Sequence, residues 1–138
     1  MTSTVVDTNI LIDILGMPNP LRDWSLSRLE QCHREGELIL SPIVWSELAA
    51  SPLTEQQLTS AFGWLRKKRE PFSYEAAFQA GKAHFGYRRA GGQRERTLPD
   101  FLIGAHAFVR SHRLLTRDSA RYRGYFPSLD IISPETHP

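Results

Sequence analysis

Four acidic side chains occupy similar places in the sequence, each at the end of a short apolar run or in an early turn of the segment that follows. They are Asp7, Glu47, Asp100 and Asp118. Carboxylates gathered within a few ångströms repel one another, so they either take up protons or hold a cation. Hard divalent ions such as Mg²⁺ and Mn²⁺ prefer oxygen ligands. If the fold brings the four acids together, the sequence predicts a site for Mg²⁺ or Mn²⁺.

Each acid also has a simpler interpretation. Aspartate is a good helix N-cap, and Asp7 and Asp118 stand where either a cap or a ligand could occur. Asp100 favours a capping role, because it follows Thr97 in a capping-box pattern. Glu47 lies too far inside its predicted helix to cap it, and taken alone it would be a surface residue. The placement of all four at one predicted edge favours the metal site.

Short apolar runs alternate with amphipathic segments along the chain. We predict strands at residues 4–6, 38–40, 71–73, 113–116 and 129–132, and helices at 9–15, 21–35, 42–50, 54–65, 74–87 and 98–109. The charged run 66–69 is predicted to be the solvated face of a helix. This alternation predicts an α/β fold with a parallel sheet covered on both faces. In such sheets the site lies beyond the carboxyl ends of the strands, where the four acids are expected.

Length and composition limit the class of protein. The chain has 138 residues, of which 41% are hydrophobic and 23% charged, as expected for one globular domain spanning residues 1–138. Its single cysteine, Cys32, cannot form an internal disulfide, so a reducing, cytoplasmic location is expected. No run of about 18 apolar residues could cross a bilayer, and we expect no leader and no membrane partner.

The net charge of +2 is too small to identify a nucleic-acid-binding protein by composition alone. Basic residues are nevertheless concentrated in a few stretches. One stretch is a predicted loop just before Asp100 that contains Arg88, Arg89, Arg94 and Arg96. These arginines could hold the phosphates of a bent or single-stranded RNA, or they could simply keep the loop solvated. The sequence leaves both interpretations open.

Four blocks of sequence, in order, carry a family resemblance. They are residues 5–13 (VVDTNILID), 41–48 (SPIVWSEL), 98–107 (LPDFLIGAHA) and 114–118 (LLTRD), and the segments 122–127 (YRGYFP) and 129–134 (LDIISP) add to them. Over essentially its whole length, the chain resembles PIN-domain ribonucleases, in particular the VapC toxins of type II toxin–antitoxin modules. The resemblance implies a three-layer α/β/α fold with a central parallel sheet of roughly four to five strands.

The resemblance also implies roles for individual residues. Asp7, Glu47, Asp100 and Asp118 would bind one or two ions of Mg²⁺ or Mn²⁺, with Thr8, Asn9 and Thr116 as supporting polar residues. The implied activity is that of a metal-dependent endoribonuclease, which uses a metal-activated water to leave 5′-phosphate and 3′-hydroxyl ends. Many relatives carry a further acid or asparagine a few residues after the fourth acid, whereas residues 119–122 here are SARY. A second ion is therefore expected to be weakly held or to arrive only with substrate.

The implied partners are an RNA substrate and a VapB-like antitoxin, and a homodimer is expected. The antitoxin's C-terminal segment would lie in a groove formed partly by the helices within residues 42–68. Two other classes of function stay open. A HAD-like phosphohydrolase would use Asp7 as a covalent nucleophile, but that chemistry needs a second acid two residues later, where the chain has Asn9. A catalytically silent PIN module for binding or regulation would have no need of four acids.

Overall fold

The computed structural model describes residues 2–16, 18–91 and 98–138. Its strands are β1 (Thr4–Val6), β2 (Leu38–Leu40), β3 (Lys67–Arg69), β4 (Arg113–Leu115) and β5 (Ile131–Ile132). Its helices are α1 (Thr8–Leu15), α2 (Pro20–Glu35), α3 (Pro42–Ala49), α4 (Glu55–Ala61), α5 (Tyr74–Arg89), α6 (Leu98–Val109) and α7 (Ala120–Arg123). The strands form one parallel sheet in the order β3-β2-β1-β4-β5. The predicted α/β fold with a central parallel sheet is confirmed.

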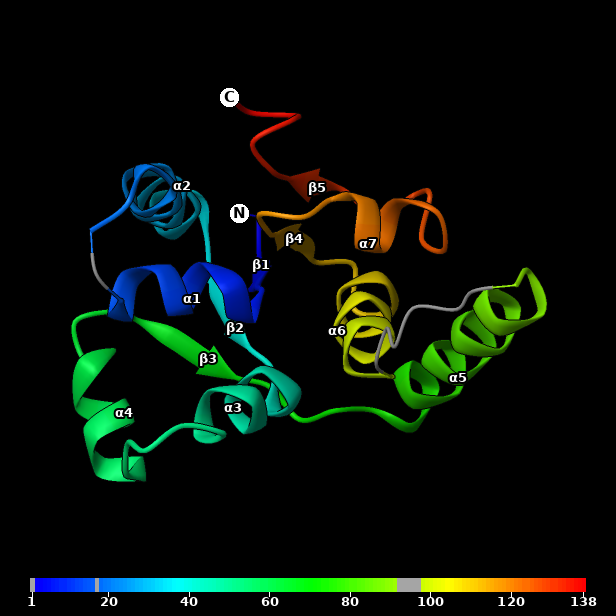
Figure 1. Ribbon diagram of the computed structural model, residues 1–138, viewed down its shortest axis with the longest axis horizontal. Coiled ribbons are helices and arrows are strands. Elements are labelled where there is room, and N and C mark those ends of the chain that lie inside the picture. Colours follow the sequence, from blue (N-terminus) through cyan, green and yellow to red (C-terminus); the bar gives the residue numbers. More distant parts are fainter. Residues whose placement is uncertain (1, 17, 92–97) are drawn as a thin grey trace.

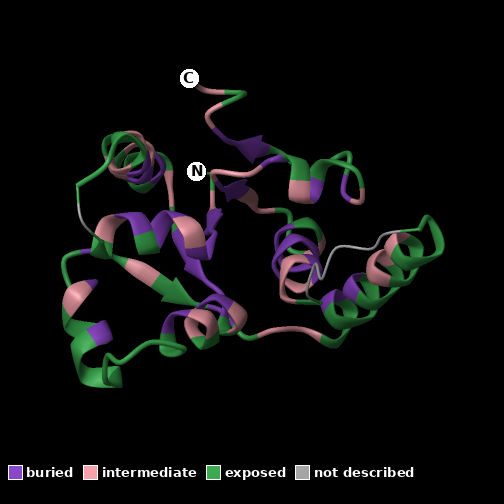
Figure 2. Ribbon diagram, viewed as in Figure 1, coloured by how far each residue is buried: buried purple, intermediate pink, exposed green. Residues whose placement is uncertain are grey.

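Helices cover both faces of this sheet (Figure 1). α1 and α2 pack together on one face, whereas α6 lies on the other face with α5 along its outer side. Buried residues follow β1, β2, β4 and β5 and the inward sides of the helices, whereas β3 and the outer sides of the helices are more exposed (Figure 2). A smaller apolar cluster joins α5, α6 and the segment after α7, through Ala76, Ala80, Phe101, Ala105 and Phe126. Among the described residues, no helix combines the length and the apolar character of a membrane span.

Polar caps fix where the first five helices begin. The side chains of Asp7, Asn19, Ser41, Thr54 and Ser73 each accept a hydrogen bond from a backbone N–H at the start of the following helix. Pro42 directly after Ser41 fits the first turn of α3, where a backbone N–H has no helical partner. Because β1 and β2 end immediately before Asp7 and Ser41, both caps lie at the carboxyl edge of the sheet.

The prediction is wrong at the third strand. β3 occupies Lys67–Arg69, where a solvated helix face was expected, and residues 71–73 form no strand. Lys67 pairs with Leu38 and Arg69 with Leu40 at the edge of the sheet. An edge strand has one unpaired side in contact with solvent and tolerates charged residues, so apolar periodicity does not reveal it. The preceding helix is also shorter than predicted, because α4 ends at Ala61.

Candidate active site

Asp7 lies between β1 and α1 at the carboxyl edge of the sheet, and it is only 3% exposed. Its Oδ1 accepts a hydrogen bond from the Thr8 backbone N–H at 2.7 Å, which caps α1. Its Oδ2 accepts hydrogen bonds from the Thr116 hydroxyl at 2.7 Å and from the Tyr122 hydroxyl at 2.8 Å. Asp7 therefore caps α1 through Oδ1 and joins a polar cluster through Oδ2.

The charge of Asp7 is poorly compensated in the folded protein. Burial raises the pKa of the Asp7 carboxyl; hydrogen bonds from Thr116, Tyr122 and Thr8 lower it in part, and the negative charge of Asp100 raises it again. Burial and the charges of Asp7 and Asp100 also raise the pKa of Tyr122 well above its usual value. Tyr122 therefore stays a neutral hydrogen-bond donor. A cation near Asp7 and Asp100 would relieve the repulsion between them.

Glu47 is connected to Asp7 through Thr8. The Thr8 hydroxyl donates to Glu47 Oε1 at 2.6 Å, while the Thr8 backbone N–H donates to Asp7. Glu47 is half-buried in the second turn of α3, the helix that follows β2. Because β1 and β2 are parallel neighbours, their following helices begin side by side and bring these two acids to the same edge.

Asp100 and Asp118 are connected through Arg121. Arg121 Nε donates to Asp118 Oδ2 at 2.9 Å, and Arg121 Nη1 lies 3.6 Å from Asp100 Oδ1. Asp100 occupies the first turn of α6, and Asp118 follows β4. Burial lowers the pKa of Arg121, but the negative charges of Asp100 and Asp118 raise it overall. Arg121 is thus a permanent cation held among the predicted ligands.

Thr116 and Asn9 hold the end of β4 against α1. Thr116 Oγ1 accepts from the Asp118 backbone N–H at 3.1 Å and from Asn9 Nδ2 at 3.4 Å. Asn9 Oδ1 accepts from the Arg117 backbone N–H at 3.2 Å. The four acids and their three polar supports therefore surround the carboxyl ends of β1, β2 and β4, while their roles as ligands stay predictions.

Comparisons with known proteins show which family this chain belongs to. The family model of the PIN domain matches residues 4–126, a range that contains all four acids. The chain belongs to the PIN-domain family. A comparison with curated protein sequences gives no significant match to this PIN domain.

Solved structures similar to this PIN domain include three toxin–antitoxin complexes. The first is VapBC2 from Rickettsia felis bound to a DNA fragment from their promoter, with a TM-score of 0.71 and 22% identity; the match covers 96% of this chain and 98% of that chain. The second is a toxin–antitoxin complex from Klebsiella pneumoniae, with a TM-score of 0.70 and 23% identity over 95% of this chain and 97% of that chain. The third is VapBC-1 from nontypeable Haemophilus influenzae, with a TM-score of 0.71 and 19% identity over 96% of this chain and 98% of that chain. At these identities the likeness establishes the fold.

The predicted RNA-binding arginines are only partly described. Arg88 and Arg89 are exposed in the last turn of α5, where the Arg89 guanidinium lies 5.8 Å from the centre of the Phe85 ring. These two residues are helical rather than part of the predicted loop. Arg94 and Arg96 lie outside the described residues, as does the proposed capping residue Thr97. A role for the arginines in binding RNA stays a prediction.

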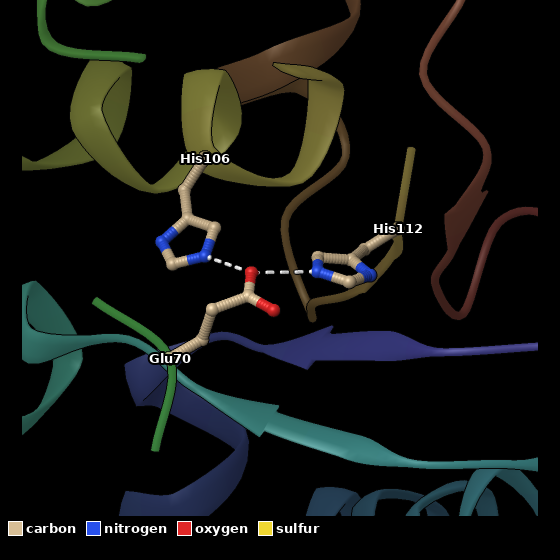
Figure 3. Close-up of side chains that lie close together, drawn as sticks. All are labelled: Glu70, His106 and His112. Atoms are coloured by element: carbon tan, nitrogen blue, oxygen red, sulfur yellow. Dashed lines mark hydrogen bonds and ion pairs between the residues drawn. The ribbon is translucent and has the colours of Figure 1, made fainter. Parts of the chain in front are cut away.

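A second polar cluster, which the sequence did not reveal, lies between α6 and the sheet (Figure 3). Glu70 Oε1 accepts hydrogen bonds from His106 Nε2 and from His112 Nε2, each at 2.8 Å. The Ser3 hydroxyl lies 2.5 Å from His112 Nδ1, and Arg110 Nε lies 3.6 Å from the Glu70 carboxylate. We refer to Glu70, His106 and His112 as the Glu–His cluster. His106 lies on α6, whereas His112 lies outside any helix, directly before β4.

The Glu–His cluster also gathers possible metal-ligand atoms. One such atom from each of its three residues lies within 4.8 Å of the other two. Both imidazole Nε2 atoms already donate to the Glu70 carboxylate, and His106 Nδ1 is buried without a hydrogen-bond partner among the described residues. The acidic site offers carboxylate oxygens instead, which suit Mg²⁺, an ion that usually keeps several waters and takes only one or two carboxylates as direct ligands.

Two residues of the acidic site were missed as site residues by sequence reasoning. Arg121 and Tyr122 both fall in the segment 119–122, where sequence analysis found no acid and predicted no site residue. Gly104 allows this segment to approach α6, because a Cβ there would lie 2.7 Å from the Phe126 ring and 3.0 Å from the Tyr122 ring. The close packing brings the Tyr122 hydroxyl to Asp7. The signal that could have found Arg121 was its i, i+3 spacing from Asp118.

Proposed function

We propose that this PIN domain is a metal-dependent endoribonuclease that acts as the toxin of a toxin–antitoxin pair. The observation that carries the proposal is the environment of Asp7, a buried carboxylate beside Asp100 with neutral hydrogen-bond donors around it. Glu47 is joined to it through Thr8. Membership of the PIN family supports nuclease chemistry, and the toxin–antitoxin complexes of the same fold support the biological role.

The donor set fits Mg²⁺ or Mn²⁺, because it consists of carboxylate oxygens without sulfur or imidazole. We assign Asp7 and Asp100 as direct ligands, Asp118 as a ligand through water, and Glu47 as a ligand or as the base that orients the attacking water. The ion would lower the pKa of that water and offset the charge that develops on the phosphate. Thr8, Thr116 and Tyr122 keep the Asp7 oxygens fixed in direction by their hydrogen bonds.

The test is an assay with total cellular RNA in the presence of Mg²⁺ or Mn²⁺, with and without EDTA, followed by mapping of the cut ends. We expect cleavage only with the ions, and products with 5′-phosphate and 3′-hydroxyl ends. Asp100→Asn should abolish cleavage because it removes a direct ligand. Asp130→Asn, a change at an exposed aspartate outside the site, is the matched control and should leave cleavage intact.

Several results would overturn the proposal. Cleavage that persists in EDTA, or in Asp100→Asn, would separate the activity from the acids. A folded wild-type protein that binds Mn²⁺ but cuts no RNA would favour a silent binding module. A phosphohydrolase would be revealed by a trapped aspartyl-phosphate on Asp7. The hydrogen bonds to both Asp7 oxygens argue against that covalent role, because they hold the carboxylate in place.

A groove beside the site supports an antitoxin partner. A cavity of about 280 Å³ lies between α1 and the segment from α3 onward, lined by Ile12, Leu15, Gly16, Glu47, Leu48, Ala50, Ser51 and Leu53. It falls partly within the predicted range 42–68. Apolar walls next to an acidic residue suit an antitoxin segment with apolar anchors and a basic residue. Leu53→Asp should therefore prevent co-purification with the antitoxin, whereas Leu21→Asp, at an equally exposed leucine on α2, should not; equal retention by both would contradict the groove assignment.

The remaining predictions belong to the same proposal. Residues 1–138 are proposed to form one domain. Two hydrogen bonds tie residues 137 and 138 to α2: Trp24 Nε1 donates to the His137 carbonyl at 2.7 Å, and Arg28 donates to the Pro138 carbonyl at 3.0 Å. A homodimer and a cytoplasmic location are proposed with the toxin role. The exposed aromatic residues Tyr74, Phe78 and Phe85 on α5 offer an apolar surface for such a dimer.

A further inference from the structure

Arg121 is a cation built into the acidic site. It lies on the short helix α7, where its Nε contacts Asp118 at 2.9 Å and its Nη1 approaches Asp100 at 3.6 Å. Its side chain is 41% exposed, so it reaches the carboxylates from the solvent side. A guanidinium stays charged at any pH at which the protein is folded. Two of the four predicted ligands therefore have a positive partner before any metal ion binds.

The backbone that carries Arg121 is held firmly at the site. The neighbouring Tyr122 is buried and donates its hydroxyl hydrogen bond to Asp7 at 2.8 Å. On the other side, the Ser119 hydroxyl donates to Glu135 at 3.0 Å. The side chain can turn toward solvent, but its starting point stays within reach of Asp100 and Asp118. The guanidinium therefore remains close to the acidic site in whichever direction its side chain turns.

A second divalent ion would compete directly with this guanidinium. To lie between Asp100 and Asp118, the ion would have to bind the two carboxylates that Arg121 now contacts. Two cations so close together would also repel each other. The first ion, which we assign to Asp7 and Asp100, meets the guanidinium only on its Asp100 side. Among the described residues, the hydrogen bonds to Asp7 and Glu47 come from neutral donors, on Thr8, Asn9, Thr116 and Tyr122.

We propose that Arg121 takes the place of a second divalent ion, so that this site binds one metal ion and uses the guanidinium as its second positive charge. With RNA bound, Arg121 would turn from the carboxylates toward a non-bridging oxygen of the phosphate, a group that guanidinium binds well. The inference rests on the proposed function, because it assumes that the four acids bind metal. It makes Arg121 a residue that sets metal stoichiometry as well as one that contacts substrate.

The first test measures metal binding without RNA, in metal-free full-length protein. Calorimetry and electron paramagnetic resonance should detect one Mn²⁺ ion per wild-type chain. Arg121→Met, which keeps the aliphatic stem but removes the charge, should gain a second ion with at least about tenfold tighter binding than any second ion of the wild type. Arg123→Met is the matched control, since Arg123 lies on the same helix and its one ion pair within the described ranges is with Glu135, at 3.9 Å.

The second test uses RNA cleavage as a function of Mn²⁺ concentration. Arg121→Met should cleave slowly at low Mn²⁺ and regain rate as Mn²⁺ rises, because a second ion then supplies the missing charge. Arg121→Lys, which keeps a charge, should need less Mn²⁺ for the same rate than Arg121→Met does. A residue with a merely structural role would give a loss that added Mn²⁺ does not restore.

The outcomes separate the two proposals. If wild type and Arg121→Met bind the same number of ions with the same affinity, the Arg121 inference is wrong while the nuclease proposal stands. If the ions bind as expected but no variant cleaves RNA, the nuclease proposal is wrong while the stoichiometric role of Arg121 stands. If neither wild type nor Arg121→Met binds Mn²⁺, both are wrong.

Discussion

The acidic site and the Glu–His cluster each centre on a buried carboxylate, Asp7 and Glu70, yet their charges are arranged in opposite ways. Asp7 lies near another carboxylate and accepts hydrogen bonds from neutral donors. Glu70 lies near two imidazoles that both donate to it, with Arg110 beside them. The Glu70 carboxylate is therefore supplied with donors and a nearby cation from within the chain, whereas Asp7 has no cation in contact with it among the described residues. A fold can tolerate such a deficit where binding a cation is the function.

The pKa shifts express the same contrast. Burial, together with Asp100, raises the pKa of Asp7 despite its hydrogen bonds. Burial would also raise the pKa of Glu70, but the hydrogen bonds and charges of His106 and His112 outweigh it and lower the pKa. Burial likewise lowers the pKa of His106, more than Glu70 raises it, so this imidazole favours its neutral form. Lowering the pH should therefore weaken the hydrogen bonds of the Glu–His cluster, and it should reduce the charge repulsion within the acidic site by protonating Asp7.

Two glutamates give the sharpest test of this contrast, and Glu47→Ala should have the largest effect. Removing the carboxylate takes away a ligand or the base of the proposed reaction, so RNA cleavage should slow by at least about 100-fold. The free energy of unfolding should change by less than about 1 kcal/mol, because Glu47 is half-buried and its partner Thr8 can turn to water. Cleavage rates and urea denaturation check both values, with Glu30→Ala on the exposed side of α2 as control.

Glu70→Ala should show the reverse pattern. It leaves two largely buried imidazole N–H groups without an acceptor, which should cost about 2–4 kcal/mol of unfolding free energy. Glu70→Gln keeps an oxygen acceptor and should lose less. Both variants, where folded, should bind Mn²⁺ as the wild type does. Impaired Mn²⁺ binding by folded Glu70→Gln would contradict the separation of the two clusters.

The two clusters also differ in how far they could be predicted from the sequence. The four acids were found because each follows a strand or lies in the first two turns of a helix, and those elements carry strong apolar patterns and caps. β3 was missed because Lys67–Arg69 has no apolar pattern and depends on pairing with β2. The Glu–His cluster was missed because its hydrogen bonds join residues 36 and 42 positions apart, with no spacing rule to connect them. Long-range pairs outside any motif need the fold before they can be seen.

Gly104→Ala would test how the packing of α6 supports the acidic site. The new Cβ would press on the rings of Phe126 and Tyr122, which lie within 3.0 Å of its position. We expect a loss of about 1–3 kcal/mol in unfolding free energy, because the rings must shift in a packed region. Moving Tyr122 should also weaken its hydrogen bond to Asp7, so Mn²⁺ affinity should fall in parallel. Gly81→Ala on α5, where a Cβ meets nothing within 4 Å, is the control and should be neutral or slightly stabilising.

Asp7→Asn should have a small effect on stability, in the stabilising direction, and pH should reveal its cause. Because the folded state raises the pKa of Asp7, its contribution to stability is fully present below the ordinary aspartate pKa and is lost as pH rises through the raised value. The neutral asparagine side chain of the variant does not lose stability as the pH rises. The hydroxyls of Thr116 and Tyr122 can turn to accept hydrogen bonds from its amide N–H groups. Without metal, the variant should therefore be more stable than the wild type by about 1 kcal/mol at neutral pH.

Urea denaturation across the acid range would measure this difference against pH. The advantage of Asp7→Asn should shrink as pH falls, because the wild-type carboxyl then takes up its proton and the two side chains become alike in charge. Added Mn²⁺ should reverse the order at neutral pH, since binding to the folded wild type stabilises it while the variant lacks a ligand. A gap that is constant with pH would mean that hydrogen bonding, not charge, sets the stability of the acidic site, and the contrast with the Glu–His cluster would then fail.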